Sequence, residues 1–173
     1  MLKFLRLSVL AVLVGTLTAA GVTANPRDLS ANLAIKMNGY LQISREAAAH
    51  RASRRVTEEE RVRMTREPNT IVLDALSAQR FNALHIEGAV NLSVPDITIT
   101  SPARAIPDKN TWVLIYCNNN FSNAEALSLV KLMTASLSLS TFIALCNYGY
   151  RNVYERRPLI DIRQSKLPFE SGI

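Results

Sequence analysis

The stretch Thr111-Trp112-Val113-Leu114-Ile115-Tyr116-Cys117 decides the fold of this 173-residue chain. Its residues 112–116 are all bulky and apolar or aromatic, and no polar position alternates with them. A strand with this pattern has to be covered on both faces, which is typical of the central strand of a mostly parallel sheet. The stretch therefore predicts an α/β fold in which helices flank the sheet on both sides.

Shorter strands and helices are predicted on either side of this central strand. Ile71-Val72-Leu73, which lies between Asn69-Thr70 and Asp74, has the length and composition of a buried strand. The other predicted strands are 89–92 and 152–154, and the predicted helices are 77–83 with Ser77 as its cap, 125–137 and 141–148. Because strands alternate with helices, we expect a mostly parallel sheet.

A helical segment is predicted ahead of the first of these strands. Residues 40–64 contain no Gly or Pro, and Thr57 followed three residues later by Glu60 is the signature of a capping box, so two helices are expected. The chain is thus expected to consist of a signal peptide (1–24), a helical N-terminal extension (25–67) and an α/β domain (68–170).

The first 24 residues have the three-part layout of a secretory signal peptide. Lys3 and Arg6 precede the apolar residues 7–17, and small residues then lead to a cleavage site after Ala24. The alternative is an uncleaved membrane anchor, but the apolar stretch is shorter than the roughly 20 residues that span a bilayer. We therefore expect a periplasmic or secreted protein that touches a membrane only through this segment, before cleavage.

The positive charge of the chain does not indicate a nucleic-acid partner. The formal net charge of +6 falls to +4 when Lys3 and Arg6 leave with the signal peptide. Much of the remaining excess lies between Arg45 and Arg66, where glutamates are interspersed among the arginines. Nucleic-acid binding favours a patch of one sign or interleaved aromatic residues, so we interpret this stretch as a solvated helical surface.

Two cysteines remain in the mature chain, Cys117 and Cys146. An oxidising compartment permits a disulfide between them. A structural zinc site needs four ligands, and no histidine cluster completes one, so neither a metal nor a cofactor is expected. Cys146 shares a predicted helix with Phe142 and Leu145, which favours a place in the core, and a resolving or regulatory thiol is the alternative.

Cys117 is the residue best suited to chemistry. It ends the central strand and opens the polar loop 118–123, and ligands of open α/β sheets gather at the carboxyl ends of strands. A loop that feeds a helix presents N–H groups and partial positive charge, both of which stabilise a thiolate. The alternative is a small buried hydrophobic residue, but this position favours a reactive thiol.

Four segments, in this order, resemble a rhodanese-like domain. They are Ile71-Val72-Leu73-Asp74, His85-Ile86-Glu87-Gly88-Ala89-Val90-Asn91-Leu92, Val113-Leu114-Ile115-Tyr116-Cys117 and Gly149-Tyr150-Arg151-Asn152-Val153-Tyr154. The resemblance covers roughly residues 68–162. The stretch Tyr-Cys-Asn-Asn-Asn-Phe at 116–121 is also similar to that of an exported bacterial subgroup. The resemblance implies a rhodanese-like fold for the domain over 68–170.

The resemblance also implies sulfur chemistry at Cys117. In the family, the cysteine thiolate takes a sulfane sulfur from a small donor such as thiosulfate, holds it as a persulfide and passes it to a thiol acceptor or cyanide. The implied substrate-binding loop is the backbone of Asn118, Asn119, Asn120, Phe121 and Ser122. Asp74 and His85 are expected to support the site structurally, and catalytic duty, with His85 as a general base, is the alternative.

The chain departs from the pattern of active sulfurtransferases. The cysteine loop contains no Arg, Lys or Gly, and Ala75-Leu76 follow Asp74 where the family has an Arg. The interval from Cys117 to Gly149 is also longer than the family's usual pattern, so residues 125–137 are interpreted as an insertion beside the active site and a candidate lid.

Three functional hypotheses remain open. The first is a sulfurtransferase or persulfide carrier, which the cysteine at the strand end favours. The second is a non-catalytic, binding or regulatory rhodanese-like module whose pocket binds a protein partner or an oxidised thiol, which the missing cations favour. The third is a thiol redox sensor that uses Cys117 and Cys146. A phosphatase of the same fold is set aside, because Ser122 and Asn123 stand where an Arg would grip the phosphate.

Overall fold

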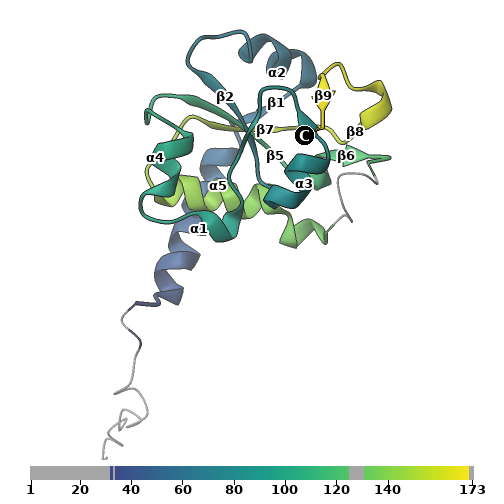
Figure 1. Cartoon of the computed structure of the whole chain (residues 1–173). Coiled ribbons are helices and arrows are strands. Elements are labelled where there is room, and N and C mark those ends of the chain that lie inside the picture. The colour runs from purple at the N-terminus through teal and green to yellow at the C-terminus, as the bar shows by residue number, and fades with distance from the viewer. Residues whose placement is uncertain (1–31, 33, 125–130, 172–173) are drawn as a thin grey trace, which may run out of the picture. The chain divides into compact units, whose positions relative to one another are not determined.

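The computed structural model describes residues 32, 34–124 and 131–171 (Figure 1). The chain divides into two units between Ile35 and Lys36, and every described helix and strand lies in the second unit, Lys36–Ile173. None of the described helices combines the length and the apolar character needed to cross a membrane. The predicted signal peptide, residues 1–24, lies outside the described residues.

A five-stranded sheet forms the centre of the second unit, and all its strand pairs are parallel. Its spatial order is β1 (Arg55–Val56), β7 (Val153–Arg156), β5 (Trp112–Tyr116), β2 (Thr70–Asp74) and β4 (Val90–Asn91). The predicted central strand is confirmed as β5, in the middle of the sheet. Its register with β2 sets Asp74 opposite Tyr116, at the edge where Cys117 follows.

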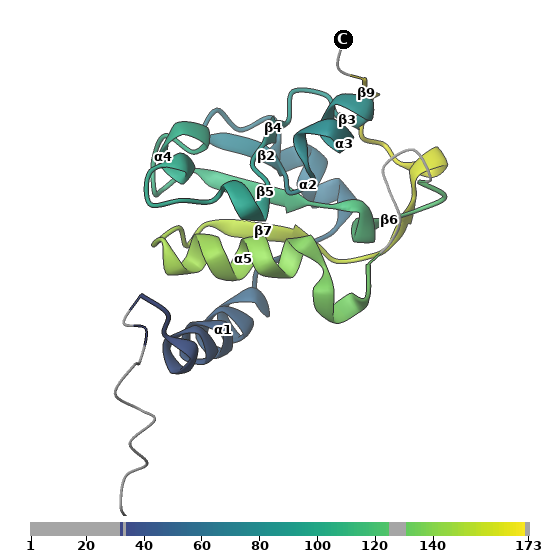
Figure 2. The same cartoon turned by 60° about the horizontal axis from the view of Figure 1, so that its bottom comes forward.

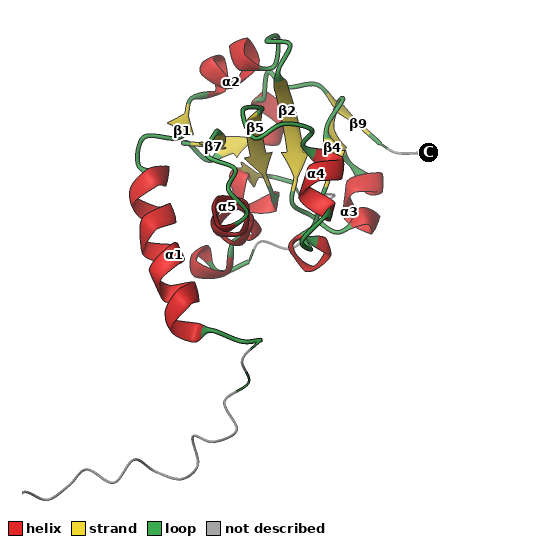
Figure 3. Ribbon diagram, turned by 90° about the vertical axis from the view of Figure 1, so that its left-hand side faces the viewer, coloured by secondary structure: helices red, strands yellow, loops and turns green. Residues whose placement is uncertain are grey.

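Helices cover both faces of this sheet, as the pattern of β5 predicts (Figures 2 and 3). On one face, Val113 and Ile115 pack in a core cluster with residues of α1 (Met37–Arg51) and α5 (Leu137–Asn147). On the other face, Leu114 and Tyr116 pack in a second cluster with Met64 of α2 (Glu58–Met64). These four side chains are fully buried, and Trp112 at the start of β5 is exposed. The predicted α/β class with its flanking helices is confirmed.

Several short elements complete the unit. Helix α3 (Ala78–Ala83) follows Ser77 as predicted, although the Ser77 side chain makes no capping hydrogen bond. The remaining elements are α4 (Ser101–Ala105), the antiparallel pair β3 (His85–Ile86) and β9 (Phe169–Glu170), the parallel pair β6 (Phe121–Ser122) and β8 (Ile160–Asp161), and the 3-10 helices η2 (Val94–Asp96), η3 (Asn118–Asn120), η4 (Met133–Ala135) and η5 (Ile162–Gln164). These elements are too short to leave a periodic apolar pattern.

The predicted helical extension contains its two helices and, between them, a strand. The capping box of α2 is confirmed: Thr57 Oγ1 accepts the Glu60 N–H (3.1 Å), and the Glu60 carboxylate accepts the Thr57 N–H (2.7 Å). Strand β1 lies between α1 and α2 and pairs with β7. The sheet therefore reaches back into the segment 25–67, which the sequence indicated as helical only.

The predicted helix 125–137 is wrong over its described part. Residues 125–130 lie outside the described residues, and the described remainder contains a single 3-10 turn, η4, instead of a continuous helix. Ser136 then adopts an extended backbone (ψ 131°) as the N-cap of α5, a position that serine favours. Helix α5 consequently begins at Leu137, four residues before the predicted start at Thr141.

Candidate active site

Cys117 lies directly after β5, at the carboxyl edge of the sheet. It is the N-cap of η3, its thiol is free, and its side chain is fully buried. Its backbone N–H donates to Asn120 Oδ1 (2.8 Å), which fixes the first turn of the loop. The sulfur is thus held at the strand end where the sequence indicated a reactive thiol, but it is covered by other side chains.

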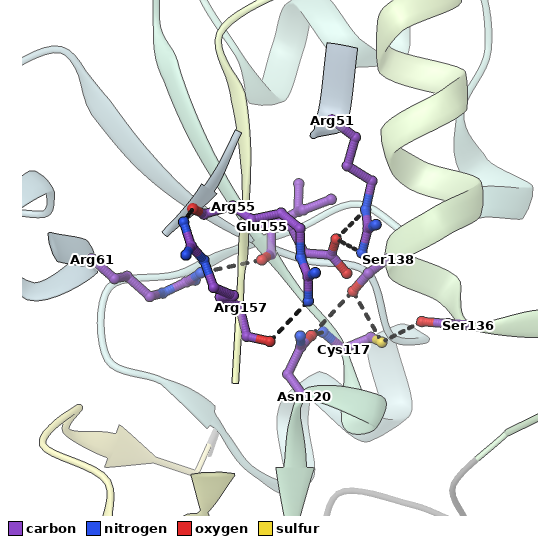
Figure 4. Close-up of polar contacts among 10 residues, drawn as sticks. Arg51, Arg55, Arg61, Cys117, Asn120, Ser136, Ser138, Glu155 and Arg157 are labelled. Carbon is purple, nitrogen blue, oxygen red and sulfur yellow. Dashed lines mark hydrogen bonds and ion pairs between the residues drawn. The ribbon is translucent and has the colours of Figure 1, made fainter. Parts of the chain in front are cut away.

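The side chains that meet the sulfur are hydroxyls from the start of α5 (Figure 4). Ser138 Oγ lies 3.1 Å and Ser136 Oγ 3.5 Å from Cys117 Sγ. Ser138 Oγ is also 3.1 Å from Asn120 Oδ1. A hydroxyl at this distance donates to a thiolate or accepts from a thiol, so both forms of the sulfur have a partner.

The N-terminus of α5 contributes a positive electrostatic potential near Cys117. Ser136 is the N-cap of this 11-residue helix, and the first turn of a helix carries partial positive charge from its unpaired N–H groups. Since Ser136 and Ser138 contact the sulfur, Cys117 lies at this end of the helix. The positive end of the α5 helix dipole therefore lies next to the Cys117 sulfur.

The predicted binding loop does not offer all of its backbone N–H groups to the sulfur. The N–H of Asn120 donates to the Cys117 carbonyl (3.0 Å), and the N–H of Phe121 donates to the Asn118 carbonyl. These two amides are engaged within the loop. Of the predicted loop side chains, Asn120 is the one with a hydrogen bond to Cys117 among the described contacts.

The other loop residues serve the surrounding structure. Asn119 exchanges hydrogen bonds with the backbone of Lys131, at 2.8 and 3.3 Å. The Phe121 ring is buried and packs edge-on against the rings of Tyr116 and Phe169. Ser122 belongs to β6 and pairs with Asp161 of β8. The loop is therefore tied to three neighbouring segments, and this limits how far it can open.

Asp74 lies next to Tyr116 on the neighbouring strand, and no described contact joins it to Cys117. Its Oδ1 accepts the Leu76 N–H (2.7 Å), and Asn91 Nδ2 donates to its backbone oxygen (3.2 Å). Burial raises the pKa of Asp74, against the lowering effect of the Tyr116 hydroxyl and the Leu76 N–H. Burial and the Asp74 charge raise the pKa of Tyr116 in turn. These contacts agree with the structural role that was expected for Asp74.

His85 is also engaged away from the sulfur. Its Nδ1 lies 2.8 Å from the Phe81 carbonyl oxygen, and its Nε2 lies 3.2 Å from Glu170 Oε1. The ring stacks on Phe81 at 3.9 Å between centroids. No described contact joins His85 to Cys117. The contacts of His85 with Phe81 and Glu170 instead join α3 to the C-terminal strand β9.

Cys146 lies in the opposite core cluster from Cys117. Burial raises the pKa of the Cys146 thiol, despite the lowering effect of Arg151. Both thiols are free, and they lie in different core clusters, so no disulfide joins them in this conformation.

Two pockets adjoin the Cys117 loop. The larger, about 300 Å³, is lined by Asn120 and Ser136, which both contact Cys117, and by four arginines: Arg51, Arg55, Arg156 and Arg157. The other, about 260 Å³, is lined by Asn118 and Leu137, with Arg80 and Lys131 as its cations. Over the described residues, no group of three His, Cys, Asp or Glu side chains is suited to a metal ion.

Sequence reasoning missed Ser136 and Ser138, because it began α5 too late. A Ser-x-Ser pattern ahead of an apolar helix was the available signal, since serine is a favoured N-cap. It also missed Arg51, Arg55 and Arg157, which come from segments more than 30 residues away from Cys117 in the chain. Only the sheet order, with β1 and β7 adjacent to each other and β7 beside β5, brings them to the site.

Comparisons with known proteins identify the family. The rhodanese-like domain model matches residues 57–156, more than half of the chain. No curated protein matches it. Similar solved structures include a rhodanese with anions from E. coli (22% identity, 60% of this chain and 99% of that chain, TM-score 0.40) and the rhodanese-like domain of an Anabaena protein (18%, 69% and 80%, TM-score 0.46).

A thiosulfate sulfurtransferase from Pseudomonas aeruginosa is also similar, at 18% identity and a TM-score of 0.48 over 78% of this chain and 24% of that chain. These identities and scores are low, so the assignment rests on the family model and not on the solved structures. The matched residues contain β2, β5, β7 and Cys117. The chain belongs to the rhodanese-like domain family.

Proposed function

We propose that this chain is a rhodanese-like sulfurtransferase or persulfide carrier in which Cys117 is the sulfur-accepting thiolate. The observation that carries the proposal is the placement of Cys117 Sγ, at the end of β5, against the Ser138 and Ser136 hydroxyls at the start of α5. Hydroxyl donors and a helix N-terminus stabilise a thiolate, and the thiolate is the nucleophile in cysteine chemistry.

The proposed step is a displacement at sulfur. The Cys117 thiolate attacks the outer sulfur of a donor such as thiosulfate, a new sulfur–sulfur bond forms, and the bond to the sulfonate group breaks. Sulfite leaves with the electron pair, and the enzyme retains a persulfide anion, so charge is conserved and no external oxidant is needed. A thiol acceptor then attacks the terminal sulfur and regenerates the Cys117 thiolate.

The second candidate is a non-catalytic binding module. Two observations favour it: the Cys117 side chain is fully buried, and the loop 118–122 carries no cation. The Ser136 hydroxyl, 3.5 Å from the sulfur, is one of the side chains packed against it. A redox sensor based on a direct Cys117–Cys146 disulfide is less favoured, because the two thiols lie in different core clusters.

Release of sulfite distinguishes these functions. The reduced chain is mixed with thiosulfate, first alone and then with an acceptor thiol. A carrier releases one equivalent of sulfite per chain, and a sulfurtransferase continues with the acceptor present. Cys117→Ser should abolish both signals, and the matched variant Cys146→Ser should retain them. If the native chain releases no sulfite, the sulfurtransferase proposal is wrong, and the non-catalytic binding module remains as the candidate function.

We further propose that the protein acts in the periplasm of a bacterium or is secreted, on the sequence pattern of residues 1–24 alone. N-terminal sequencing of the full chain, expressed in a bacterium and recovered from the periplasmic fraction, should begin at Asn25. An intact N-terminus in the membrane fraction would contradict this and support an anchor.

A further inference from the structure

A further cavity, of about 260 Å³, lies between α2 and the central sheet. Its lining comes from α2 and the residues just after it, and from β1, β5 and β7. Trp112, which lines the cavity, begins β5, whereas Cys117 follows the last residue of that strand. Five residues of a strand span about 16 Å, and none of the loop residues 118–122 lines this cavity. The cavity is therefore separate from the candidate active site.

Two aromatic rings form one wall of this cavity. The ring centroids of Trp112 and Tyr154 lie 6.0 Å apart, and the ring planes are tilted by 57°. Arg54 donates to the Tyr154 hydroxyl (2.5 Å) and lies over its ring, 5.0 Å from the centroid, so Tyr154 is held in place. Trp112 is 37% exposed, and within the described ranges no cation lies over its ring. The Trp112 ring is therefore available to a ligand.

The charged residues that line the cavity give it a net negative charge. Glu60, Arg63 and Glu67 follow one another at intervals of three and four residues, the spacing of one helix face. The hydrogen bond from the Thr57 N–H, and to a smaller extent the charge of Arg63, lower the pKa of Glu60. Glu67 is exposed and forms no ion pair with any residue that the structure describes. Since Arg63 offsets Glu60, the charge of Glu67 remains uncompensated.

We propose that this cavity binds a small organic cation that carries a guanidinium or ammonium group. The face of a tryptophan ring is the strongest aromatic site for a cation, and the Glu67 carboxylate accepts the cation's N–H groups. The buried side chains of Val56 and Met64 complete the lining, which suits the hydrocarbon part of such a ligand. The inference goes beyond the proposed function, because it involves neither Cys117 nor sulfur transfer.

Tryptophan fluorescence measures binding at this cavity directly, because the chain has a single tryptophan. The native chain is titrated with Nα-acetyl-arginine amide, which is a cation, and with Nα-acetyl-citrulline amide, its neutral isostere. The cation should change the emission in a saturable way, with a dissociation constant at least about tenfold below that of the neutral probe, the equivalent of about 1.4 kcal/mol. No saturable change with the cation, or equal dissociation constants for the two probes, would overturn the proposal.

Two charge variants test the role of the acidic lining. Glu67→Gln should weaken binding of the cation about tenfold, because a charge-assisted hydrogen bond is lost, and should leave binding of the neutral probe unchanged. The matched control Glu87→Gln, at an exposed position outside the cavity, should bind both probes as the native chain does. Arg63→Gln removes a like charge and should strengthen binding of the cation several-fold. Native affinity in Glu67→Gln, or weaker binding of the cation in Arg63→Gln, would overturn the proposal.

Two further variants separate this cavity from the candidate active site. Cys117→Ser lacks the proposed nucleophile and should bind the cation with native affinity, and loss of binding in that variant would contradict a separate site. Trp112→Leu should lose most of the affinity, which ligand-observed NMR measures because the fluorophore is gone. Native affinity in Trp112→Leu would remove the ring from the site and overturn the proposal. If Trp112→Leu does not fold, the comparison of Glu67→Gln with its control decides.

Discussion

The Ser138 hydroxyl carries one proton and lies between two acceptors. Cys117 Sγ and Asn120 Oδ1 are each 3.1 Å from its oxygen. With an ionised sulfur, the hydroxyl donates to the thiolate; with a protonated sulfur, it accepts from the thiol and donates to the amide oxygen. Rotation of one hydroxyl therefore matches both states of the nucleophile, and no charged residue of the loop is required.

Ser138→Ala removes this donor and should slow sulfur loading of Cys117 about tenfold, since a hydrogen bond to a charged group contributes about 1.5 kcal/mol. The rate of sulfite release under single-turnover conditions measures the effect. Ser140→Ala, two residues further along α5, is the matched control and should load at the native rate. Equal rates for Ser138→Ala and the native chain would show that the hydroxyl does not stabilise the reacting sulfur.

At the scale of elements, Glu58 joins α2 to β7 and to the C-terminal segment. Its Oε1 lies 2.8 Å from Arg156 Nη2 and accepts from Ser165 Oγ (2.8 Å) and the Lys166 N–H (3.0 Å). Burial raises the pKa of Glu58, but the hydrogen bonds from Arg156, Ser165 and Lys166 outweigh burial and leave the pKa below its ordinary value of 4.5. The Glu58 carboxylate thus compensates the charge of the buried Arg156, which is one of the residues that line the larger pocket beside the Cys117 loop.

Glu58→Gln should lower the free energy of unfolding at pH 7 by about 3 kcal/mol, because it leaves a buried guanidinium without its counter-charge. Since the folded-state pKa is lowered, this stability is fully present above pH 4.5 and is lost as the pH falls through the folded pKa. Urea unfolding at several pH values measures the difference, which should shrink in acid. The matched variant Glu59→Gln, at an exposed ion pair with Lys166, should change little, and an equal loss in both variants would contradict the assignment.

At the scale of the whole molecule, the N-terminal extension is part of the support of the central strand. The buried Arg61 of α2 donates to the carbonyl oxygens of Leu114 (2.9 Å) and Ile115 (3.1 Å), just ahead of Cys117. Burial lowers the pKa of Arg61 to about 10, so it remains charged at neutral pH. Together with β1 and the arginines of α1 and β1, this contact ties the segment before residue 68 to the sheet.

The parts predictable from sequence were those with a long and unambiguous pattern. Residues 112–116 predicted β5 and its central position, because a strand that is apolar on both faces has to be covered on both. The Thr57–Glu60 spacing predicted the start of α2 for a local reason, the capping box. The place of Cys117 at the end of β5 was predictable for the same reason, and its catalytic role stays a prediction.

The surroundings of the sulfur could not be predicted in this way. Ser136 and Ser138 reach Cys117 from α5, and Arg55 and Arg157 reach the pocket from two adjacent strands, so both sets depend on tertiary packing. Two-residue strands such as β1 give no periodicity to detect. The loop 118–122 predicted amide donors, but its Asn120 and Phe121 amides are engaged in η3.

The central claim, that Cys117 accepts a sulfur atom, is tested most directly by the intact mass of the reduced mature chain after brief exposure to thiosulfate. The native chain and the Cys146→Ser variant should each gain the mass of one sulfur atom, which a reductant removes. The Cys117→Ser variant should gain none. A native chain whose mass does not change with thiosulfate or a polysulfide, or a gain that persists in Cys117→Ser, would contradict the account.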